Sequence, residues 1–247
     1  MILLIDAGNT SVKWGSYAAG SIVTSGSFMH RGGIITDLAD QSWSELQRPA
    51  EVYMASVAAA DTAQPLSDWI VKQWDITPVF ISSTAQACGV TNAYKVPEHL
   101  GVDRWVALIG AHHYGGGAQC IVDCGTAITL DMLAADGVHQ GGLILPGVKM
   151  MKHMLLKNTA IKYSSCKQDS ANLFAMGTED AINSGALYMA TAAIDRIVGD
   201  MKVAAGTHLD VVVTGGDASR ILTLLVCPAR HDPELVLKGL AILAGGR

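Results

Sequence analysis

The chain has 247 residues, of which 50% are hydrophobic and only 16% are charged, and its formal net charge is −5. This composition predicts a large buried core and excludes a disordered chain, and it lacks the basic balance typical of nucleic-acid binding. No segment reaches the roughly 18 uninterrupted apolar residues of a membrane span, and residues 1–5 meet an aspartate too soon for a signal peptide. We therefore expect a cytoplasmic protein without a nucleic-acid or membrane partner.

The cysteines are scattered along the chain and odd in number, so reduced thiols are the simplest expectation. Cys120 and Cys124 lie close together, but no second pair of Cys or His with ligand spacing accompanies them. We expect these two side chains to fill a strand and its turn rather than to bind zinc. The other three are Cys88, Cys166 and Cys227.

Predicted strands and helices alternate in the N-terminal half, which favours an α/β layer architecture. The first three strands follow one another without a helix, as in a mixed sheet. Strands are expected over residues 1–5, 12–17, 21–28, 51–57 and 78–81, and helices over 36–47, 64–74 and 105–113.

Three consecutive glycines at 115–117 predict a boundary between two lobes, residues 1–116 and 117–247. In the second lobe, an apolar strand and its turn over 119–129 come first. A return strand is expected over 131–133, a strand that ends in a turn over 138–146, and a further strand over 209–213. Helices are expected over 148–156, 178–201 and 235–244.

Two details of these helices are predicted. The methionines of the 148–156 helix, Met150, Met151 and Met154, are expected to pack in the core. Thr178 is expected to cap the start of the 178–201 helix, since a threonine followed by acidic residues is a helix-start pattern.

A strand that runs into an aspartate and a glycine turn occurs twice. Residues 3–10 read L-L-I-D-A-G-N-T, and residues 121–131 read I-V-D-C-G-T-A-I-T-L-D. Each copy delivers one carboxylate, Asp6 or Asp123, to a turn with N–H and hydroxyl donors. Carboxylates bind hard cations such as Mg²⁺, and N–H groups and hydroxyls bind phosphate oxygens. The repetition predicts a nucleotide site in which the two turns face each other across a cleft.

A third turn, Thr214-Gly215-Gly216-Asp217, follows another buried strand, and its glycines permit a close approach of the backbone to adenine or ribose. The chain has neither a Walker sequence nor G-x-G-x-x-G, so nucleotide binding would use the carboxylate-bearing turns. The pair Asp103-Arg104 follows a loop over 92–101 and precedes a predicted helix. It is either a functional pair or simply a helix N-cap with a surface cation beside it.

Taken together, these motifs resemble those of type III pantothenate kinases, in the superfamily of acetate and sugar kinases, Hsp70 and actin. They follow the family's order over nearly the whole chain, and residues 101–104 separate this family from its sugar-kinase relatives. The resemblance is carried by residues 6–10, Tyr94, Pro97, and residues 101–104, 123–127, 141–147 and 214–218.

The resemblance implies ATP-dependent phosphorylation of pantothenate to 4′-phosphopantothenate, the first step of coenzyme A biosynthesis. It also implies an α/β fold of two RNase H-like lobes with an ATP cleft between them. The family works as a homodimer and needs Mg²⁺ or another divalent cation together with a monovalent cation, K⁺ or NH₄⁺.

Site residues follow from the resemblance by position. Asp103 would be the catalytic base, Asp123 would bind the monovalent cation, and Asp6 would hold the Mg²⁺ that accompanies ATP. ATP would contact Asp6, Ala7, Gly8, Asn9, Thr10, Ser11, Val12, Lys13 and Thr126. Pantothenate would contact Tyr94, Gly101, Val102, Asp103, Arg104 and Thr178.

Two other functions stay open. A sugar or acetate kinase, or a polyphosphate phosphatase, shares the two aspartate turns, and the segment over 94–104 is what distinguishes it. A nucleotide-binding regulator without turnover is the other alternative, and Asp103 beside both turns favours the enzyme. The 178–201 helix is the candidate for pairing the subunits.

Overall fold

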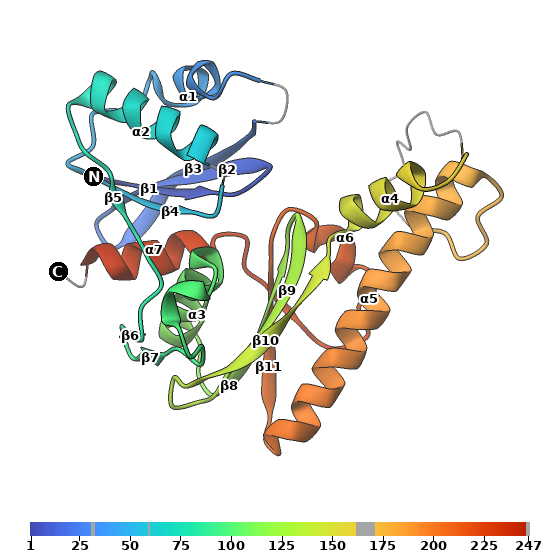
Figure 1. Ribbon diagram of the computed structural model, residues 1–247. Helices are drawn as coiled ribbons and strands as arrows, with labels where there is room; N and C mark the ends of the chain where they lie inside the picture. Colours follow the sequence, from blue (N-terminus) through green and yellow to red (C-terminus); the bar gives the residue numbers. More distant parts are fainter. Residues whose placement is uncertain (31–32, 59, 162–170, 246–247) are drawn as a thin grey trace. The chain divides into compact units, whose positions relative to one another are not determined.

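The computed structural model describes residues 1–30, 33–58, 60–161 and 171–245 (Figure 1). Its contacts divide the chain into two compact units, Met1–Tyr114 with Glu234–Arg247, and Gly115–Pro233. Each unit is a mixed β-sheet flanked by helices, so the α/β fold class is confirmed. The units differ from the predicted lobes at the C-terminal end, because the last helix, α7 (Leu235–Gly245), belongs to the first unit.

The sheet of the first unit has the order β3-β2-β1-β4-β5. β1 pairs antiparallel with β2 and parallel with β4, so the sheet is mixed as predicted. β1 is buried on both faces, which explains its continuous apolar run. The strands are β1 Ile2–Ala7, β2 Ser11–Ala18, β3 Ser21–Met29, β4 Glu51–Ser56 and β5 Val79–Phe80.

Helices α1 (Ile35–Trp43) and α2 (Ala60–Trp74) lie on one face of this sheet, and α3 (Val102–Tyr114) and α7 on the other (Figure 1). Under α1 and α2, Trp43 is fully buried among four aromatic rings, with centroids 5.6–6.4 Å from its own. On the other face α7 meets α3 so closely that a side chain at Gly239 would strike the carbonyl of Val106. Glycine at position 239 thus permits the close packing of α7 on α3 within the first unit.

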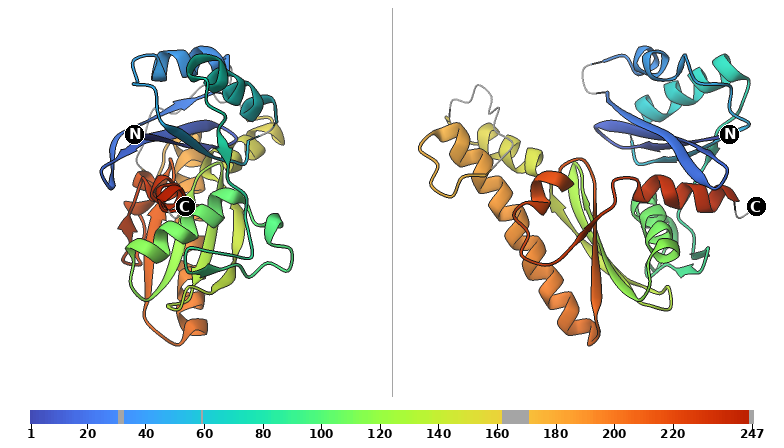
Figure 2. Two further views of the ribbon diagram at one scale, coloured as in Figure 1. Left: turned by 90° about the vertical axis from the view of Figure 1, so that its left-hand side faces the viewer. Right: turned by 180° about the vertical axis from the view of Figure 1, so that it is seen from behind.

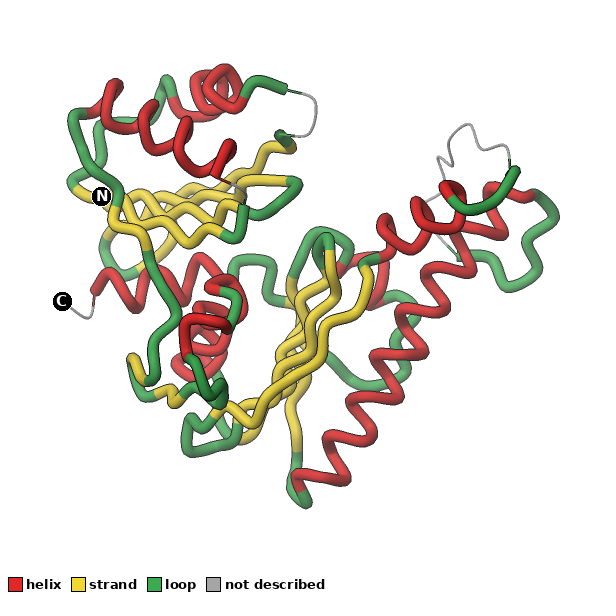
Figure 3. Tube along the Cα trace, in the orientation of Figure 1, coloured by secondary structure: helices red, strands yellow, loops and turns green. Residues whose placement is uncertain are grey.

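The segment between β5 and α3 is mostly loop (Figure 3). It contains the short hairpin β6 (Gln86–Ala87) and β7 (Val90–Thr91), and the 3-10 turn η1 (Pro97–His99). α3 begins three residues earlier than predicted, so Asp103 and Arg104 lie in its first turn.

The sheet of the second unit has the order β10-β9-β8-β11-β12, which repeats the first in arrangement. Its central strand β8 pairs antiparallel with β9 and parallel with β11, as β1 does with β2 and β4. The repeated sequence motif is therefore part of a repeated sheet. The strands are β8 Ala118–Cys124, β9 Ala127–Leu133, β10 His139–Pro146, β11 Leu209–Thr214 and β12 Arg230–His231.

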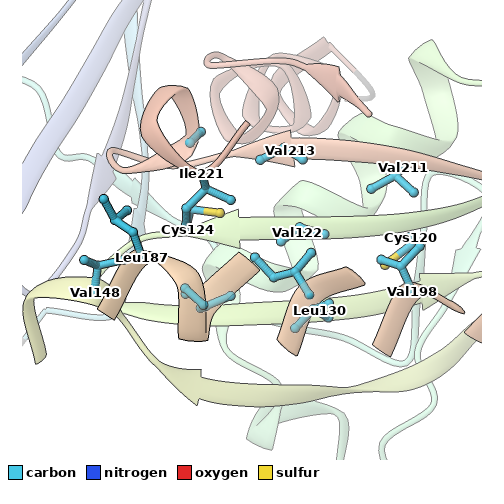
Figure 4. Close-up of a cluster of buried hydrophobic side chains, with 14 of the residues drawn as sticks. Cys120, Val122, Cys124, Leu130, Val148, Leu187, Val198, Val211, Val213 and Ile221 are labelled. Carbon is cyan, nitrogen blue, oxygen red and sulfur yellow. The ribbon is translucent and has the colours of Figure 1, made fainter. Parts of the chain in front are cut away.

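Helix α5 (Thr178–Ala205) runs along one face of this sheet (Figure 2), and α6 (Ala218–Leu222) packs into the same core. Figure 4 shows this core, in which Val122, Leu187 and Ile221 meet from three elements. α5 begins with Gly177 as its N-cap and without a side-chain cap, so the prediction that Thr178 caps it was wrong.

Helix α4 (Val148–Lys157) buries only Val148. Met150 and Met154 are 41% and 52% exposed, so the prediction that they pack in the core was wrong for these two. Met151 is half-buried against the core, in agreement with the prediction. The helix has an apolar stripe, but most of it faces solvent within this unit.

The search for a membrane-spanning helix covers 1–30, 33–58, 60–161 and 171–245, and within those ranges no helix combines the required length and apolarity. The four cysteines in these ranges are free thiols, and Cys166 lies outside the described residues.

Candidate active site

Asp6 is the penultimate residue of β1 and stands opposite Lys13 on β2. Residues directly opposed in an antiparallel pair project to the same face of the sheet. The carboxylate and the ammonium group therefore share one face, and both side chains are half-buried. This arrangement places a negative and a positive group at the turn that was expected to bind ATP.

Backbone hydrogen bonds and one histidine hold this first turn. The N–H of Gly8 donates to the carbonyl of Ser11 at 3.0 Å. His30 contacts the turn twice: its N–H donates to the carbonyl of Thr10 at 3.1 Å, and its Nε2 lies 2.9 Å from the carbonyl oxygen of Gly8. Because a carbonyl only accepts, Nε2 carries a proton. No sequence motif pointed to His30, which reaches the turn from the end of β3.

At the start of α3 the carboxylate of Asp103 folds back on its own helix. Its Oδ1 accepts a hydrogen bond from the N–H of Arg104 at 2.8 Å. A Cβ at Gly101 would lie 2.7 Å from the same oxygen, so glycine leaves the space that this carboxylate occupies. Asp103 is half-buried in the first turn of α3, the end of the helix where backbone N–H groups are available to donate.

Arg104 is 6% exposed and is paired with Tyr94. Its Nη1 donates to the Tyr94 hydroxyl at 2.9 Å, and its guanidinium carbon lies 5.7 Å from the centre of the ring. Asn92 fixes the backbone here, because its Oδ1 accepts from the N–H of Tyr94 at 3.0 Å. The structure thus brings Tyr94, Asp103 and Arg104 together on the loop and the first turn of α3.

In the second unit Asp123 is the penultimate residue of β8, as Asp6 is of β1. It pairs in register with Thr129 on β9 and with Thr214 on β11, so these side chains share a face. The hydroxyl of Thr214 is fully buried and has no hydrogen-bond partner in the part of the chain that the structure describes. A buried, unpaired hydroxyl costs about 1–3 kcal/mol, so it marks a position where an additional ligand would stabilise the site.

Gly215 follows Thr214 and packs directly on the second aspartate turn, the one that contains Asp123 and Cys124. Its φ is +97°, a conformation that side chains rarely adopt. A Cβ there would lie 2.5 Å from both the backbone N and C of Cys124 and would collide with the carboxylate of Asp123. The N–H of Asp217 donates to the carbonyl of Cys124 at 2.9 Å, so the third turn is locked against the second.

Gly147, the N-cap of α4, presses on the other side of the second turn. Its N–H donates to the carbonyl of Thr126 at 3.1 Å. A Cβ on Gly147 would lie 2.5 Å from the carbonyl oxygen of Gly125 and closer still to that of Thr126. Its φ of −70° is ordinary, so close approach alone requires glycine at this position.

Cys124 is fully buried within this arrangement. Burial raises the pKa of its thiol far above the ordinary value, and the negative charges of Asp123 and Asp217 raise it further. The thiol therefore stays protonated and packs as a small apolar group. Over the described ranges no three metal-ligating side chains gather into a cluster.

The expected site residues fall into two sets by unit. The first unit carries the Asp6 turn, Tyr94 and the start of α3, and the second carries Asp123, Thr126 and Thr178. Thr178 is an exposed first residue of α5. Sequence analysis did not identify three residues near Asp217. Arg220 contacts Asp217 and Asn183, and Lys152 contacts Asn183, each from a different helix.

The same strand order in each of the two sheets, with an aspartate turn after each central strand, defines an α/β protein of the fold shared by sugar kinases and by actin- and Hsp70-like ATPases. A Campylobacter jejuni protein described as a Baf family transcriptional activator matches it with a TM-score of 0.60 at 18% identity, covering 99% of this chain and 98% of that one. The activator of the 2-hydroxyisocaproyl-CoA dehydratase from Clostridium difficile, with bound ADPNP, matches with a TM-score of 0.53 at 12% identity, covering 98% and 93%. At these identities the likeness shows the fold.

The chain belongs to the type III pantothenate kinase family, whose profile matches residues 2–200. The type III pantothenate kinase of Nitrosococcus oceani is 43% identical, covering 99% of this chain and 94% of that protein. Those of Burkholderia cenocepacia and Nitrosomonas eutropha are 39% and 36% identical, each covering 98% of this chain and 94% of the relative. The family predicted from the motifs is confirmed.

Proposed function

We propose that this chain transfers the γ-phosphoryl group of ATP to the primary hydroxyl of pantothenate, with Asp103 as the base. Family membership supports the reaction itself, ATP-dependent pantothenate phosphorylation in coenzyme A biosynthesis. The observation that carries the residue assignment is the position of Asp103, half-buried in the first turn of α3 beside the Arg104–Tyr94 pair.

In the proposed step the hydroxyl oxygen of pantothenate forms a bond to the γ-phosphorus while the bond to the bridging oxygen of ADP breaks. The hydroxyl proton passes to the carboxylate of Asp103, late in a transition state that is loose. Arg104 is buried and holds Tyr94, so we assign it to shaping the pantothenate pocket together with Gly101, Val102 and the tyrosine.

ATP is assigned to the turn from Asp6 to Lys13 and to Thr126. Lys13 shares a face with Asp6, where its ammonium group would offset charge on the γ-phosphate. Asp6 is a half-buried carboxylate at a strand end and fits the hard Mg²⁺ that accompanies ATP. Bound Mg²⁺ would neutralise charge on the transferred group.

Asp123 is assigned to a monovalent cation, K⁺ or NH₄⁺. Its neighbours in register, Thr129 and Thr214, supply neutral oxygens, and the buried Thr214 hydroxyl has no hydrogen-bond partner among the described residues. One carboxylate with neutral oxygen ligands suits a singly charged cation. With the cation bound at Asp123 and Thr214, K⁺ or NH₄⁺ should raise the thermal unfolding midpoint of the wild-type protein but not that of Thr214→Val. An equal rise in both proteins would contradict the assignment.

A homodimer is the proposed assembly, with a second copy covering the apolar surface of the second unit. Met154 on α4 is 52% exposed, Phe174 and Met176 before α5 are 80% and 100% exposed, and Met189 on α5 is 58% exposed. Large exposed apolar side chains on neighbouring elements mark an interaction surface. The α5 helix was the segment expected to pair the subunits.

A coupled assay for ADP release tests the reaction and the base together. The wild-type protein is expected to release ADP only with both pantothenate and Mg-ATP, and faster with K⁺ or NH₄⁺. Asp103→Asn should lower kcat by about 10²–10⁴-fold, the usual contribution of a general base. Near-normal turnover in this variant would remove Asp103 from that role.

A further inference from the structure

The side-chain oxygen of Asn183 is a meeting point for two cationic side chains from different helices. Asn183 lies on α5 and is 1% exposed. Its Oδ1 accepts from Nη2 of Arg220 on α6 at 2.9 Å and from Nζ of Lys152 on α4 at 3.1 Å. Two donors facing one atom require an acceptor there, so the orientation of the amide is fixed.

Arg220 also reaches the third turn. Its Nη1 lies 3.4 Å from Oδ1 of Asp217, and the two side chains are 17% and 10% exposed. The N–H of Asp217 in turn donates to the carbonyl of Cys124, the neighbour of Asp123. Arg220 therefore spans from the buried amide on α5 to the turn that packs on the Asp123 site.

We propose that Arg220 is a positioning residue for the nucleotide, and that Asn183 sets its direction. The guanidinium fork holds two partners at once with two different nitrogens, which a lysine ammonium group cannot do in the same planar geometry. The fork keeps Asp217 and the glycines before it in one position against the second turn. The inference rests on the proposed function in assigning the nucleotide to these turns.

Asn183 suits this role because its side-chain oxygen accepts hydrogen bonds from both cationic side chains. Lys152 approaches the same oxygen from α4, the helix whose N-cap Gly147 contacts the second turn. The network thus joins the two elements that clamp the Asp123 turn, one through Gly147 and one through Asp217. Replacing a residue of this network is expected to displace the turns assigned to the nucleotide while the rest of the second unit stays folded.

The test compares Arg220→Lys and Arg220→Gln with a matched control, Arg196→Gln. Arg196 forms an exposed ion pair with Asp200 on α5, where the two side chains are 80% and 64% exposed. Loss of one charge-assisted hydrogen bond predicts that KM for ATP rises about tenfold in both Arg220 variants. KM for pantothenate and the circular dichroism spectrum are expected to stay as in the wild type, and Arg196→Gln should change nothing.

Asn183 supplies a second pair of variants. Asn183→Asp keeps an acceptor for both cations and is expected to retain the wild-type KM for ATP, whereas Asn183→Leu should resemble Arg220→Lys. A wild-type KM for ATP in Arg220→Lys would overturn the proposal, because charge alone would then suffice. Equal rises in both KM values, or a loss of folded structure, would also overturn it in favour of a purely structural role.

Thr126→Val separates this inference from the proposed function. If Thr126→Val raises KM for ATP and Arg220→Lys does not, only the role of Arg220 is wrong. If neither variant changes KM for ATP, the assignment of the nucleotide to the turns of this unit is wrong as well.

Discussion

Replacing Gly147 by alanine tests whether the second turn is held by backbone contact. The added Cβ would lie 2.5 Å from the carbonyl oxygen of Gly125 and closer still to that of Thr126. Gly177 is the matched control, because it is also a helix N-cap with an extended backbone and no side-chain cap, but nothing lies within 4 Å of its added Cβ. The main difference between the two substitutions is what the new methyl group meets.

The expected cost follows from two effects. Forcing a methyl group into a filled space costs about 1–3 kcal/mol. Moving α4 away would also weaken the Gly147–Thr126 hydrogen bond, which is worth about 1 kcal/mol. Gly147→Ala should therefore lower the free energy of unfolding by about 2–4 kcal/mol more than Gly177→Ala. The loss of a glycine N-cap is common to both variants and cancels in the comparison.

Urea unfolding followed by far-ultraviolet circular dichroism is the appropriate measurement. Intrinsic fluorescence would not serve, because all five tryptophans lie in the first unit and Gly147 lies in the second. Displacement of Thr126 should also lower kcat/KM for ATP by about tenfold or more, since a shift of 1 Å can cost about 10²-fold. Equal stability and equal ATP kinetics in the two variants would show that the contact does not hold the turn.

Three further predictions concern the thiols, the aromatic core and the assembly. Burial raises the pKa of the Cys120 thiol from 9.0 to about 12, and the negative charge of Asp131 adds to the shift. The stabilising effect of this buried thiol is complete below pH 9. Between pH 9 and about pH 12 the free energy of unfolding should fall by about 1.4 kcal/mol per pH unit, because only the thiol of the unfolded chain ionises there. Cys120→Ala should flatten this part of a curve of unfolding free energy against pH. Trp43→Ala should cost about 3–5 kcal/mol in a urea titration, and a cost below 1 kcal/mol would contradict the packing. Met189→Glu should yield monomers in light scattering, while Val203→Glu, about 21 Å further along α5, should not.

The sequence predicted the elements well where hydrophobic period and turn residues agree. Every strand and helix that it predicted has a counterpart, and each of the two aspartates lies one residue before the end of its strand, next to the expected turn. Starts of helices were less accurate: α2 begins at Ala60 rather than at 64, and α3 at Val102 rather than at 105. The added first turns are rich in polar residues, so they carry no apolar period to mark them.

Long-range contacts explain what the sequence did not predict. The return of α7 to the first unit depends on Gly239 against Val106, a contact between residues far apart in the chain. Likewise, Asn183 and Arg220 meet only because α5 and α6 pack on the same sheet face. The exposed methionines of α4 were predicted to be buried, because an apolar stripe has the same sequence pattern whether it faces its own core or another surface.

The two halves share a sheet arrangement but differ in the side chain that stands opposite each aspartate. Asp6 faces Lys13 across its hairpin, whereas Asp123 faces Thr129 and has Thr214 on its other side. A lysine opposite a carboxylate favours a polyanion with its divalent cation, while hydroxyls favour a small cation of single charge. Under the proposed assignments, one duplicated turn would bind two different ligands through a change of the facing residue. It follows that exchanging these facing residues, rather than the aspartates, should exchange the ion preference of the two turns.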